Sequence, residues 1–317
     1  MAMDSGRYEV GNDEVGLRLD RFLADHRPDH SRSKWSRWIR DGLVLIDGLP
    51  AHPSARLALG SVVTYELPVA RDERLEAEAI PLTLIFEDRD VLVLDKPAGL
   101  VVHPGSGVDR GTLAAGLLHF DPKLAGVGGP ARAGIVHRLD VGTSGVMVIA
   151  RSDSAHRNLS AQFRDREVTK VYQAIVWGRP RERSGEIEAP IGRDPRRRVK
   201  MAVGGSAARP AKSRYTVVEE VPGFARVDVE IFTGRTHQIR VHLEHLGYPI
   251  VGDKLYGGDR SRGIQDAIRR NTVKLFDRPA LHAHRLAFDH PRSGKRMTFE
   301  VAMPEEMQAL WRILRGE

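Results

Sequence analysis

Apolar residues near the N-terminus recur at the spacing of two short helices. Leu19, Phe22 and Leu23 lie three and four residues apart, which predicts an amphipathic helix. A second helix is expected to begin with Ser31 as its N-cap and to end at Gly42, where glycine can adopt the left-handed conformation. Both predicted helices precede the first strand pattern of the chain.

The predicted second helix has an apolar face and a basic face. Trp35, Trp38 and Ile39 are the apolar residues expected to be buried, and Arg37 and Arg40 project from the other side. A basic helix face is usually only a solvated surface, but it can also bind the phosphates of RNA. Arg37 and Arg40 are therefore candidate RNA-binding residues.

Two strand patterns follow the helices. Residues 43–46 and 61–67 are rich in β-branched and other apolar side chains, and Asp47-Gly48 between them is typical of a hairpin turn. Helices and strands together predict a small α+β domain at the start of the chain.

Composition along the chain divides it into four parts. We expect a flexible tail over 1–13, a small domain over 14–68, a charged linker over 69–80 and a larger domain over 81–317. The larger domain is predicted to be of the α+β class, with helices packed on a mixed sheet. Its strands are expected at 82–86, 91–94, 145–150, 168–177, 215–219, 225–232 and 296–301, and its helices at 112–119, 154–164 and 236–246.

Composition also excludes several classes of protein. The 317 residues include no cysteine, which excludes disulfides, thiolate zinc sites and cysteine nucleophiles. No run approaches the roughly 18 apolar residues of a membrane helix, and the N-terminus does not resemble a signal peptide. We therefore expect a cytoplasmic protein. Its net charge of +7 favours a polyanionic partner.

One short segment combines a base, an acid and a tight turn. GIVHRLDVGTSG at 134–145 places Arg138 and Asp140 before a turn of small residues. Taken alone, the segment fits an active-site acid and fits equally an ion pair at a strand end, with the carboxylate capping the turn. His137 in the same segment is expected to be an ordinary core histidine.

Four segments in one order resemble the RluA family of pseudouridine synthases. Beside GIVHRLDVGTSG, they are LDKPAGLVVHP at 94–104, VTKVYQAIVWG at 168–178 and TGRTHQIRVHLEHLGYPIVGDKLYG at 233–257. The region from Gly16 to Leu67 resembles the S4 RNA-binding domain, an arrangement similar to RluD-type members of the family. Four separated motifs in the family's order make a specific match.

The resemblance implies an isomerase that converts uridine to pseudouridine in RNA without a cofactor. The N1–C1′ bond breaks, the uracil turns, and C5 joins C1′. The resemblance also implies a largely antiparallel catalytic sheet and large-subunit (23S) ribosomal RNA as the substrate. Transfer RNA is the alternative substrate, and a catalytically silent role in ribosome assembly is the alternative function. We expect a monomer.

The motifs provide three catalytic candidates by resemblance. Asp140 matches the family's catalytic aspartate, whose carboxylate is able to attack C1′, stabilise a cationic sugar or take a proton. Tyr172 matches the active-site tyrosine, expected to stack on uracil and to take the C5 proton, although tyrosine is also ordinary in a strand. Arg235 matches the basic residue expected to pair with Asp140. Arg240 is the nearby alternative, and otherwise a phosphate contact.

Further residues are expected to bind the RNA. By resemblance, Arg138 enters the space that the flipped base leaves, and Thr143 contacts the substrate from the turn after the catalytic acid. Between 193 and 214, eight basic residues accompany one acidic residue, which predicts a mobile basic hairpin that follows a phosphate backbone. Arg197 and Arg198 are its candidate RNA contacts.

Two rival chemistries have weaker support in the sequence. His242 and His245 on a helix, with His282 and His284 on a strand, are able to bind zinc, but 13 histidines in the chain make some proximity expected by chance. A glycosidase needs a second carboxylate, for which Asp95 is the candidate. We expect no metal.

Overall fold

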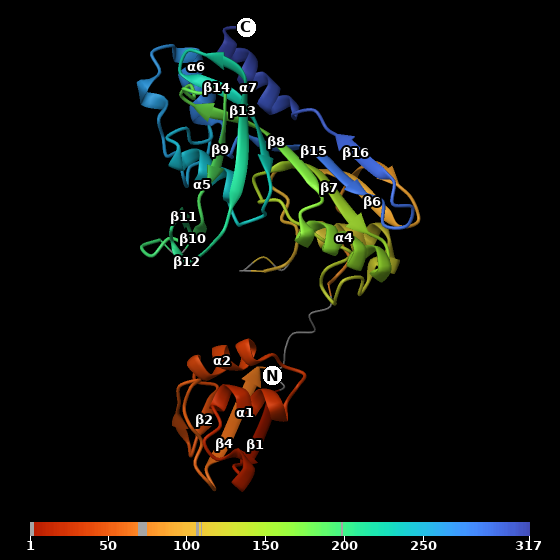
Figure 1. Cartoon of the computed structure of the whole chain (residues 1–317), viewed down its shortest axis with the longest axis vertical. Helices are drawn as coiled ribbons and strands as arrows, with labels where there is room; N and C mark the ends of the chain where they lie inside the picture. The colour runs from red at the N-terminus through yellow and green to blue at the C-terminus, as the bar shows by residue number, and fades with distance from the viewer. Residues whose placement is uncertain (1–2, 69–74, 106–107, 109, 198) are drawn as a thin grey trace. The chain divides into compact units, whose positions relative to one another are not determined.

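The computed structural model describes the chain except residues 1–2, 69–74, 106–107, 109 and 198. The chain divides into two compact units, Met1–Glu73 and Arg74–Glu317 (Figure 1). This division falls inside the segment expected to be a linker. Among the described residues, no helix combines the length and the apolarity needed to cross a bilayer.

The smaller unit is a four-stranded antiparallel sheet with two helices, in the strand order β1-β4-β2-β3. The Ser31 hydroxyl accepts a hydrogen bond from the Lys34 N–H, which confirms the predicted N-cap of α2. Phe22 and Trp35 are fully buried at the centre of the unit. The elements are β1 (Met3–Glu9), α1 (Leu19–His26), α2 (Arg32–Arg40), β2 (Val44–Ile46), β3 (Leu49–Pro50) and β4 (Val62–Pro68).

The prediction of a flexible tail over 1–13 is wrong for Met3–Glu9. These residues form β1, which pairs with β4 along its whole length. Tyr8 of β1 packs edge-on against Phe22, with ring centroids 6.1 Å apart. The partner strand lies more than fifty residues later in the chain, so the local pattern alone does not show that this segment is ordered.

The larger unit is built on one mixed sheet in the order β5-β6-β7-β15-β8-β14-β13-β9, with β16 also paired to β15. Every pair in it is antiparallel except β7 with β15, which confirms the predicted fold class. Strands β10, β11 and β12 form a separate small sheet.

The bounds of the larger unit's strands are β5 (Thr83–Glu87), β6 (Val91–Lys96), β7 (Ser144–Ala150), β8 (Thr169–Trp177), β9 (Ser184–Glu188), β10 (Ile191–Arg193), β11 (Met201–Val203), β12 (Ser206–Arg209), β13 (Lys212–Val221), β14 (Phe224–Ile231), β15 (Leu281–Asp289) and β16 (Arg296–Glu300). Its helices are α3 (Leu113–Phe120), α4 (Asp153–Asp165), α5 (Gln238–His245), α6 (Ala267–Leu275) and α7 (Glu305–Arg315). Short 3₁₀ turns lie at Asn12–Glu14 in the smaller unit and at Pro122–Leu124 and Ser261–Gly263 in the larger one.

Apolar side chains project from both faces of the large sheet. On β6, Val91 and Val93 pack in the same cluster as Leu159 of α4, whereas Leu92 and Leu94 belong to the main core on the other face. A strand buried on both faces carries a continuous apolar run, which is why residues 91–94 are uniformly hydrophobic. Figure 1 shows α4 lying along one side of the sheet.

Residues 75–80, the described part of the expected linker, lie against the larger unit. Leu75 packs against the main core, and the Glu78 N–H donates to the Ala115 carbonyl of α3 at 3.1 Å. Leu75 and Ile80 are the large apolar residues of this segment, which also contains two glutamates and two alanines, and both are half-buried.

One close approach joins β7 to β15. Ser144 pairs with His282 and Gly145 with Ala283, in the single parallel contact among the described strands of this sheet. The Ser144 Oγ and His282 Nδ1 atoms lie 3.0 Å apart, and burial lowers the pKa of His282 to about 4, so the ring is neutral at pH 7. This contact anchors the chain just after Asp140.

Gly145→Ala is expected to lower the free energy of unfolding by about 2–5 kcal/mol, through steric overlap and backbone strain. Gly145 has a φ of +122°, and a Cβ atom there would lie 2.3 Å from the Ala283 carbonyl oxygen. Urea denaturation measures the loss. Gly258→Ala is the control, because Gly258 has a φ of +63° but no atom within 4 Å of the Cβ position. Equal losses in the two variants would contradict the close approach.

Candidate active site

Motifs that are distant in the sequence meet at one end of the central strands. Asp140 lies in the loop before β7, Tyr172 lies in β8, and Arg240 lies in α5. The Thr143 N–H donates to the Asp140 carbonyl at 3.0 Å and closes the predicted turn. These four residues line one cavity of about 100 Å³, which is room for several water molecules.

Arg240 bridges two carboxylates. Its Nη1 donates to Asp140 Oδ2 at 3.2 Å, while Nε and Nη2 donate to the two oxygens of Asp253 at 2.7 and 3.0 Å. Asp253 is only 1% exposed. Burial opposes the charged guanidinium, but the hydrogen bonds and negative charges of both carboxylates raise the pKa of Arg240 above its ordinary value. Arg240 therefore fixes the position of the Asp140 carboxylate.

The predicted ion pair between Asp140 and Arg235 is wrong. Arg235 Nε donates instead to the Pro210 carbonyl at 3.0 Å, and Arg240, the alternative residue, holds Asp140. Arg235 precedes α5, whereas Arg240 lies in its first turn with a buried side chain. The choice depends on where the helix begins, which the spacing of the motif does not reveal. Arg235 still lines the cavity.

Two residues that were not among the sequence-based candidates belong to this region: His237 lies beside Asp140, and Tyr256 contacts His237 and Arg240. His237 stands before α5 in the left-handed conformation, at φ 57° and ψ 22°. Its Nε2 lies 4.0 Å from Asp140 Oδ2, and its Nδ1 lies 2.9 Å from the Tyr256 hydroxyl. Burial lowers the pKa of His237 below its ordinary value. Both residues belong to the segment 233–257, so the motif contained them without indicating their contacts.

Tyr172 forms one wall of the cavity. It is 8% exposed in β8, between β15 and β14. Burial, with the negative charge of Asp140, raises the pKa of Tyr172 well above the ordinary value of a phenol. The hydroxyl therefore stays protonated, and the ring is available for stacking. Taking a proton from C5 would need a phenolate, which these surroundings disfavour.

Arg138 and Thr143 have opposite environments at the cavity. Arg138 is exposed, whereas Thr143 is 2% exposed and its hydroxyl has no hydrogen-bond partner among the described residues. Buried hydroxyls are usually paired, so the unpaired Thr143 hydroxyl is an exception at this cavity. His137 is confirmed as a core histidine, because its Nε2 accepts from the Val148 N–H, its ring stacks on Phe163, and burial lowers its pKa to about 3.

Known proteins are similar to this chain over the region that contains these residues. The family model described as RNA pseudouridylate synthase matches residues 90–245, a range that includes Asp140, Tyr172 and Arg240. The Pseudomonas aeruginosa protein named ribosomal large subunit pseudouridine synthase D is 44% identical over 98% of this chain and 94% of its own length. The chain belongs to the RNA pseudouridylate synthase family.

Other comparisons agree with this membership. An Escherichia coli K12 protein of the same name is 39% identical over 97% of this chain and 94% of its own. The solved structure of human RNA pseudouridylate synthase domain containing 4 has a TM-score of 0.60 and 25% identity, covering 74% of this chain and 93% of that one. A model of the S4 domain matches residues 17–63 of this pseudouridine synthase.

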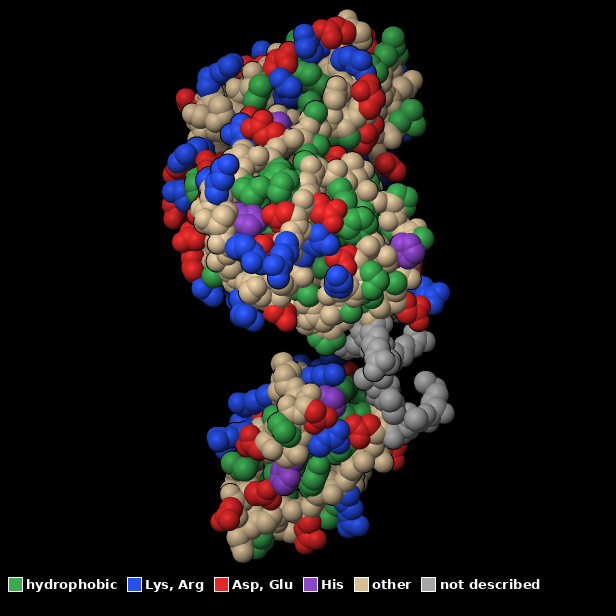
Figure 2. Space-filling model, turned by 90° about the vertical axis from the view of Figure 1, so that its right-hand side faces the viewer, with side chains coloured by type: hydrophobic (Ala, Val, Ile, Leu, Met, Phe, Trp, Pro, Cys, Tyr) green, Lys and Arg blue, Asp and Glu red, His purple; other side chains and the backbone are tan. Residues whose placement is uncertain are grey.

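The candidate RNA contacts outside the cavity lie on exposed elements of this pseudouridine synthase. Arg197 lies at the turn between β10 and β11, where its N–H donates to Asp194 Oδ1 at 3.1 Å. Arg198 lies outside the described residues. Arg37 and Arg40 are exposed on α2. On the face of the larger unit seen in Figure 2, Lys and Arg side chains gather with some acidic side chains among them.

The histidines considered as zinc ligands are bonded within the fold or exposed. His242 Nδ1 lies 2.9 Å from Ser213 Oγ. Ring nitrogens of His282 and His284 lie 3.1 and 2.7 Å from the same backbone carbonyl oxygen. His245 is exposed at the end of α5. The two pairs therefore do not converge on one point as the zinc hypothesis required.

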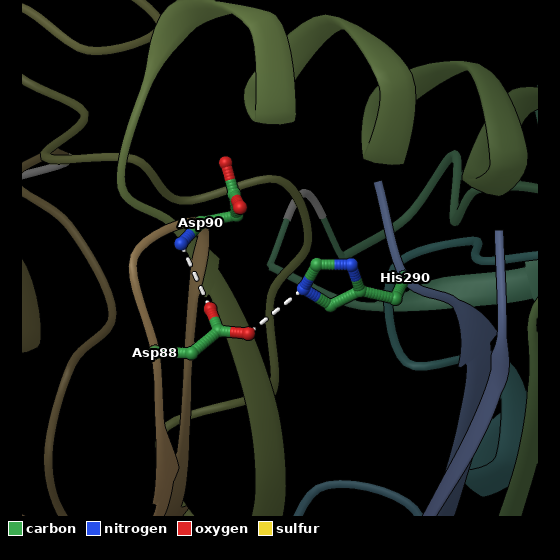
Figure 3. A group of neighbouring side chains, drawn as sticks. All are labelled: Asp88, Asp90 and His290. Carbon is green, nitrogen blue, oxygen red and sulfur yellow. Dashed lines mark hydrogen bonds and ion pairs between the residues drawn. The ribbon is translucent and has the colours of Figure 1, made fainter. Parts of the chain in front are cut away.

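A different cluster, Asp88, Asp90 and His290, brings its possible ligand atoms within 4.8 Å of one another (Figure 3). Asp88 accepts a hydrogen bond from the Asp90 N–H at 2.8 Å and lies 2.8 Å from His290 Nε2. Arg292 donates to both carboxylate oxygens of Asp90. These bonds tie the turn between β5 and β6 to the end of β15.

Arg240→Met is expected to lower the free energy of unfolding of this pseudouridine synthase by about 3–5 kcal/mol, because Asp253 would be left buried without its cation. Arg235→Met is the matched control and should cost about 1 kcal/mol, since it removes a bond to a carbonyl. Urea denaturation at pH 7 measures both. A control loss as large as that of Arg240→Met would contradict the structural difference between the two arginines.

Proposed function

We propose that this protein isomerises specific uridines to pseudouridine in large-subunit ribosomal RNA, with Asp140 acting at C1′. The cavity that unites Asp140, Tyr172 and Arg240 carries the proposal, because it surrounds one oriented carboxylate with an aromatic wall. The names of the relatives at 44% and 39% identity support ribosomal RNA as the substrate. The S4 match and the net charge of +7 support RNA binding.

The chemistry requires a negative group beside the sugar. Breaking the N1–C1′ bond leaves positive charge at C1′, which the Asp140 carboxylate can stabilise through space or capture as a covalent ester. The uracil then turns, C5 bonds to C1′, the C5 hydrogen leaves as a proton, and N1 gains a proton. Arg240 holds the carboxylate at 3.2 Å, so little reorganisation is needed when the sugar charge develops.

The remaining cavity residues have roles around the uracil. A flipped base that enters the cavity meets the Tyr172 ring and the unpaired Thr143 hydroxyl. Arg138 is exposed beside the cavity, where a planar guanidinium can replace the base in its stack. Arg235 lines the cavity and is suited to a phosphate or base contact. No cofactor is required by this scheme.

The RNA would be held by exposed basic elements. Arg37 and Arg40 on α2 and Arg197 on the hairpin are suited to phosphate contacts. We propose that the enzyme acts as a monomer in the cytoplasm, where ribosomal RNA is available.

The glycosidase alternative has less support from the geometry. The second carboxylate on Arg240 is Asp253, which is 1% exposed and bonded through both oxygens. Asp95 lies in β6 and is absent from the residues that line the cavity. Hydrolysis of a glycosidic bond needs two carboxylates that flank the bond. Among the described residues that line the cavity, Asp140 is the one that carries a carboxylate.

Asp140→Asn is expected to reduce pseudouridine formation by roughly 10³-fold or more while RNA affinity stays within about twofold, because the amide cannot neutralise charge at C1′. The rate is measured as tritium released from RNA that carries [5-³H]uridine, since the C5 hydrogen is lost. Affinity is measured by filter binding.

Asp165→Asn serves as the matched control for the carboxylate. Asp165 pairs with Arg164 at an exposed position at the end of α4, and its replacement should leave both rate and affinity unchanged. If Asp140→Asn kept activity within tenfold of the original protein, the carboxylate would have no part in the chemistry.

The substrate is tested by mapping pseudouridines in cells with and without the gene. We expect sites in large-subunit ribosomal RNA to lose modification in its absence and to regain it when the gene, but not its Asp140→Asn variant, is restored. Transfer RNA is mapped in parallel. Loss confined to transfer RNA would contradict the ribosomal assignment and favour the alternative substrate.

A further inference from the structure

Tyr256 lies between the basic hairpin and the catalytic cavity. It is 6% exposed, and two cations contact its ring. The Arg240 guanidinium carbon lies 4.9 Å from the ring centroid, and Lys200 Nζ lies 5.0 Å from it. Both distances are within the range of a cation–π interaction. Arg240 belongs to the active site, and Lys200 belongs to the hairpin.

The Tyr256 hydroxyl forms a second connection between the same two regions. It accepts a hydrogen bond from the Met201 N–H of β11 at 2.9 Å and lies 2.9 Å from His237 Nδ1. Burial raises the pKa of Tyr256 to about 12, so the phenol keeps its proton. With Met201 donating, the phenol is free to donate to His237 Nδ1. When it donates to Nδ1, the remaining ring proton of His237 lies on Nε2.

The Nε2–H of His237 then faces the reacting carboxylate. Nε2 lies 4.0 Å from Asp140 Oδ2, which is about 1 Å beyond a hydrogen bond. A small approach of His237 would give Asp140 a second donor beside Arg240. The Tyr256 hydroxyl sets this orientation, because a His237 ring with its proton on Nδ1 would turn a lone pair toward the carboxylate.

The hairpin is fixed to this region at its base and exposed at its tip. Met201 and Val203 pack in a cluster with Tyr256, and Lys200 Nζ forms an ion pair with Glu244 of α5 at 3.3 Å. At the tip, by contrast, Val199 is 77% exposed. Phosphate contacts at the tip would therefore hold strand β11, and with it the Met201 N–H, against Tyr256.

We propose that Tyr256 is a positioning residue that couples RNA contact at the hairpin to the arrangement of Arg240 and His237 around Asp140. This inference rests on the proposed function. It predicts that the hairpin contributes to the rate of isomerisation as well as to RNA affinity. A hairpin that served as a phosphate contact alone would change affinity and leave the rate of bound RNA unaltered.

The first test replaces Tyr256 by Phe, which keeps the ring between its two cations and removes both hydrogen bonds of the hydroxyl. The substrate is large-subunit ribosomal RNA from cells that lack the gene, and the full-length enzyme is in excess. We expect the single-turnover rate at saturation to fall about tenfold, while the half-saturating enzyme concentration stays within about twofold. Tyr248→Phe is the control, because the Tyr248 hydroxyl bonds the Arg181 N–H and lies outside the cavity.

A second variant tests the orientation of His237 separately from the stability of the fold. His237→Asn keeps a polar atom near the Nδ1 position, suits the left-handed backbone and removes the group that faces Asp140. We expect its melting temperature to match that of the original protein and its saturating rate to fall about tenfold. The double variant with Tyr256→Phe should be no slower than either single variant.

The coupling itself is tested with the hairpin tip. Arg196 and Arg197 are both exposed near the tip. Replacing both by Ala should weaken RNA binding in the original protein and in the Tyr256→Phe variant. It should lower the saturating rate by about threefold in the original protein and not at all in the Tyr256→Phe background.

A saturating rate unchanged by Tyr256→Phe, or lowered equally by the hairpin change in both backgrounds, would overturn the coupling. An original protein that modifies none of this RNA would instead overturn the proposed function.

Discussion

The arrangement of this active site depends on one guanidinium shared by two carboxylates. Arg240 is bonded through two nitrogens to Asp253, which is almost completely buried, and through the third to Asp140 at the cavity. A buried charge without a partner is strongly destabilising. Because Asp253 is buried, its two hydrogen bonds to Arg240 hold the guanidinium in place. The remaining nitrogen then orients the carboxylate of Asp140, the proposed catalytic residue.

The strands around this pair give it a rigid frame. The loop that carries Asp140 continues into β7, and β7 meets β15 at the close contact of Gly145 with Ala283. Tyr172 lies on β8, the other neighbour of β15. Three adjacent strands therefore determine how far the carboxylate lies from the aromatic wall. A side chain at position 145 would separate these strands, which explains why a glycine stands there.

Burial controls the protonation of two side chains that line the cavity. It holds Tyr172 as a neutral phenol and lowers the pKa of His237 below its ordinary value. Arg240, the cation on Asp140, is itself balanced by the second carboxylate. In the proposed reaction, the developing charge of the sugar is met by a carboxylate whose position Arg240 already sets.

Features that depend on local pattern could be predicted from the sequence. Periodicity and capping located α2 with Ser31 at its start, and the motifs placed Asp140 and Tyr172 in one site. Alternating apolar runs indicated the α+β class. The order of strands in the sheet could not be predicted from the sequence, and neither could the pairing of β1 with β4. Partner strands are determined by contacts between segments that are distant in the chain.

Which arginine holds Asp140 depends on long-range packing and could not be predicted from the motif. Arg235 and Arg240 stand five residues apart in one motif, and their charges are identical. The start of α5 turns Arg240 inward toward Asp253, while Arg235 remains before the helix and bonds the Pro210 carbonyl. The contacts of His237 and Tyr256 were hidden for the same reason. Spacing along a chain shows which residues are neighbours in sequence, but the burial of a partner decides where a charge lies.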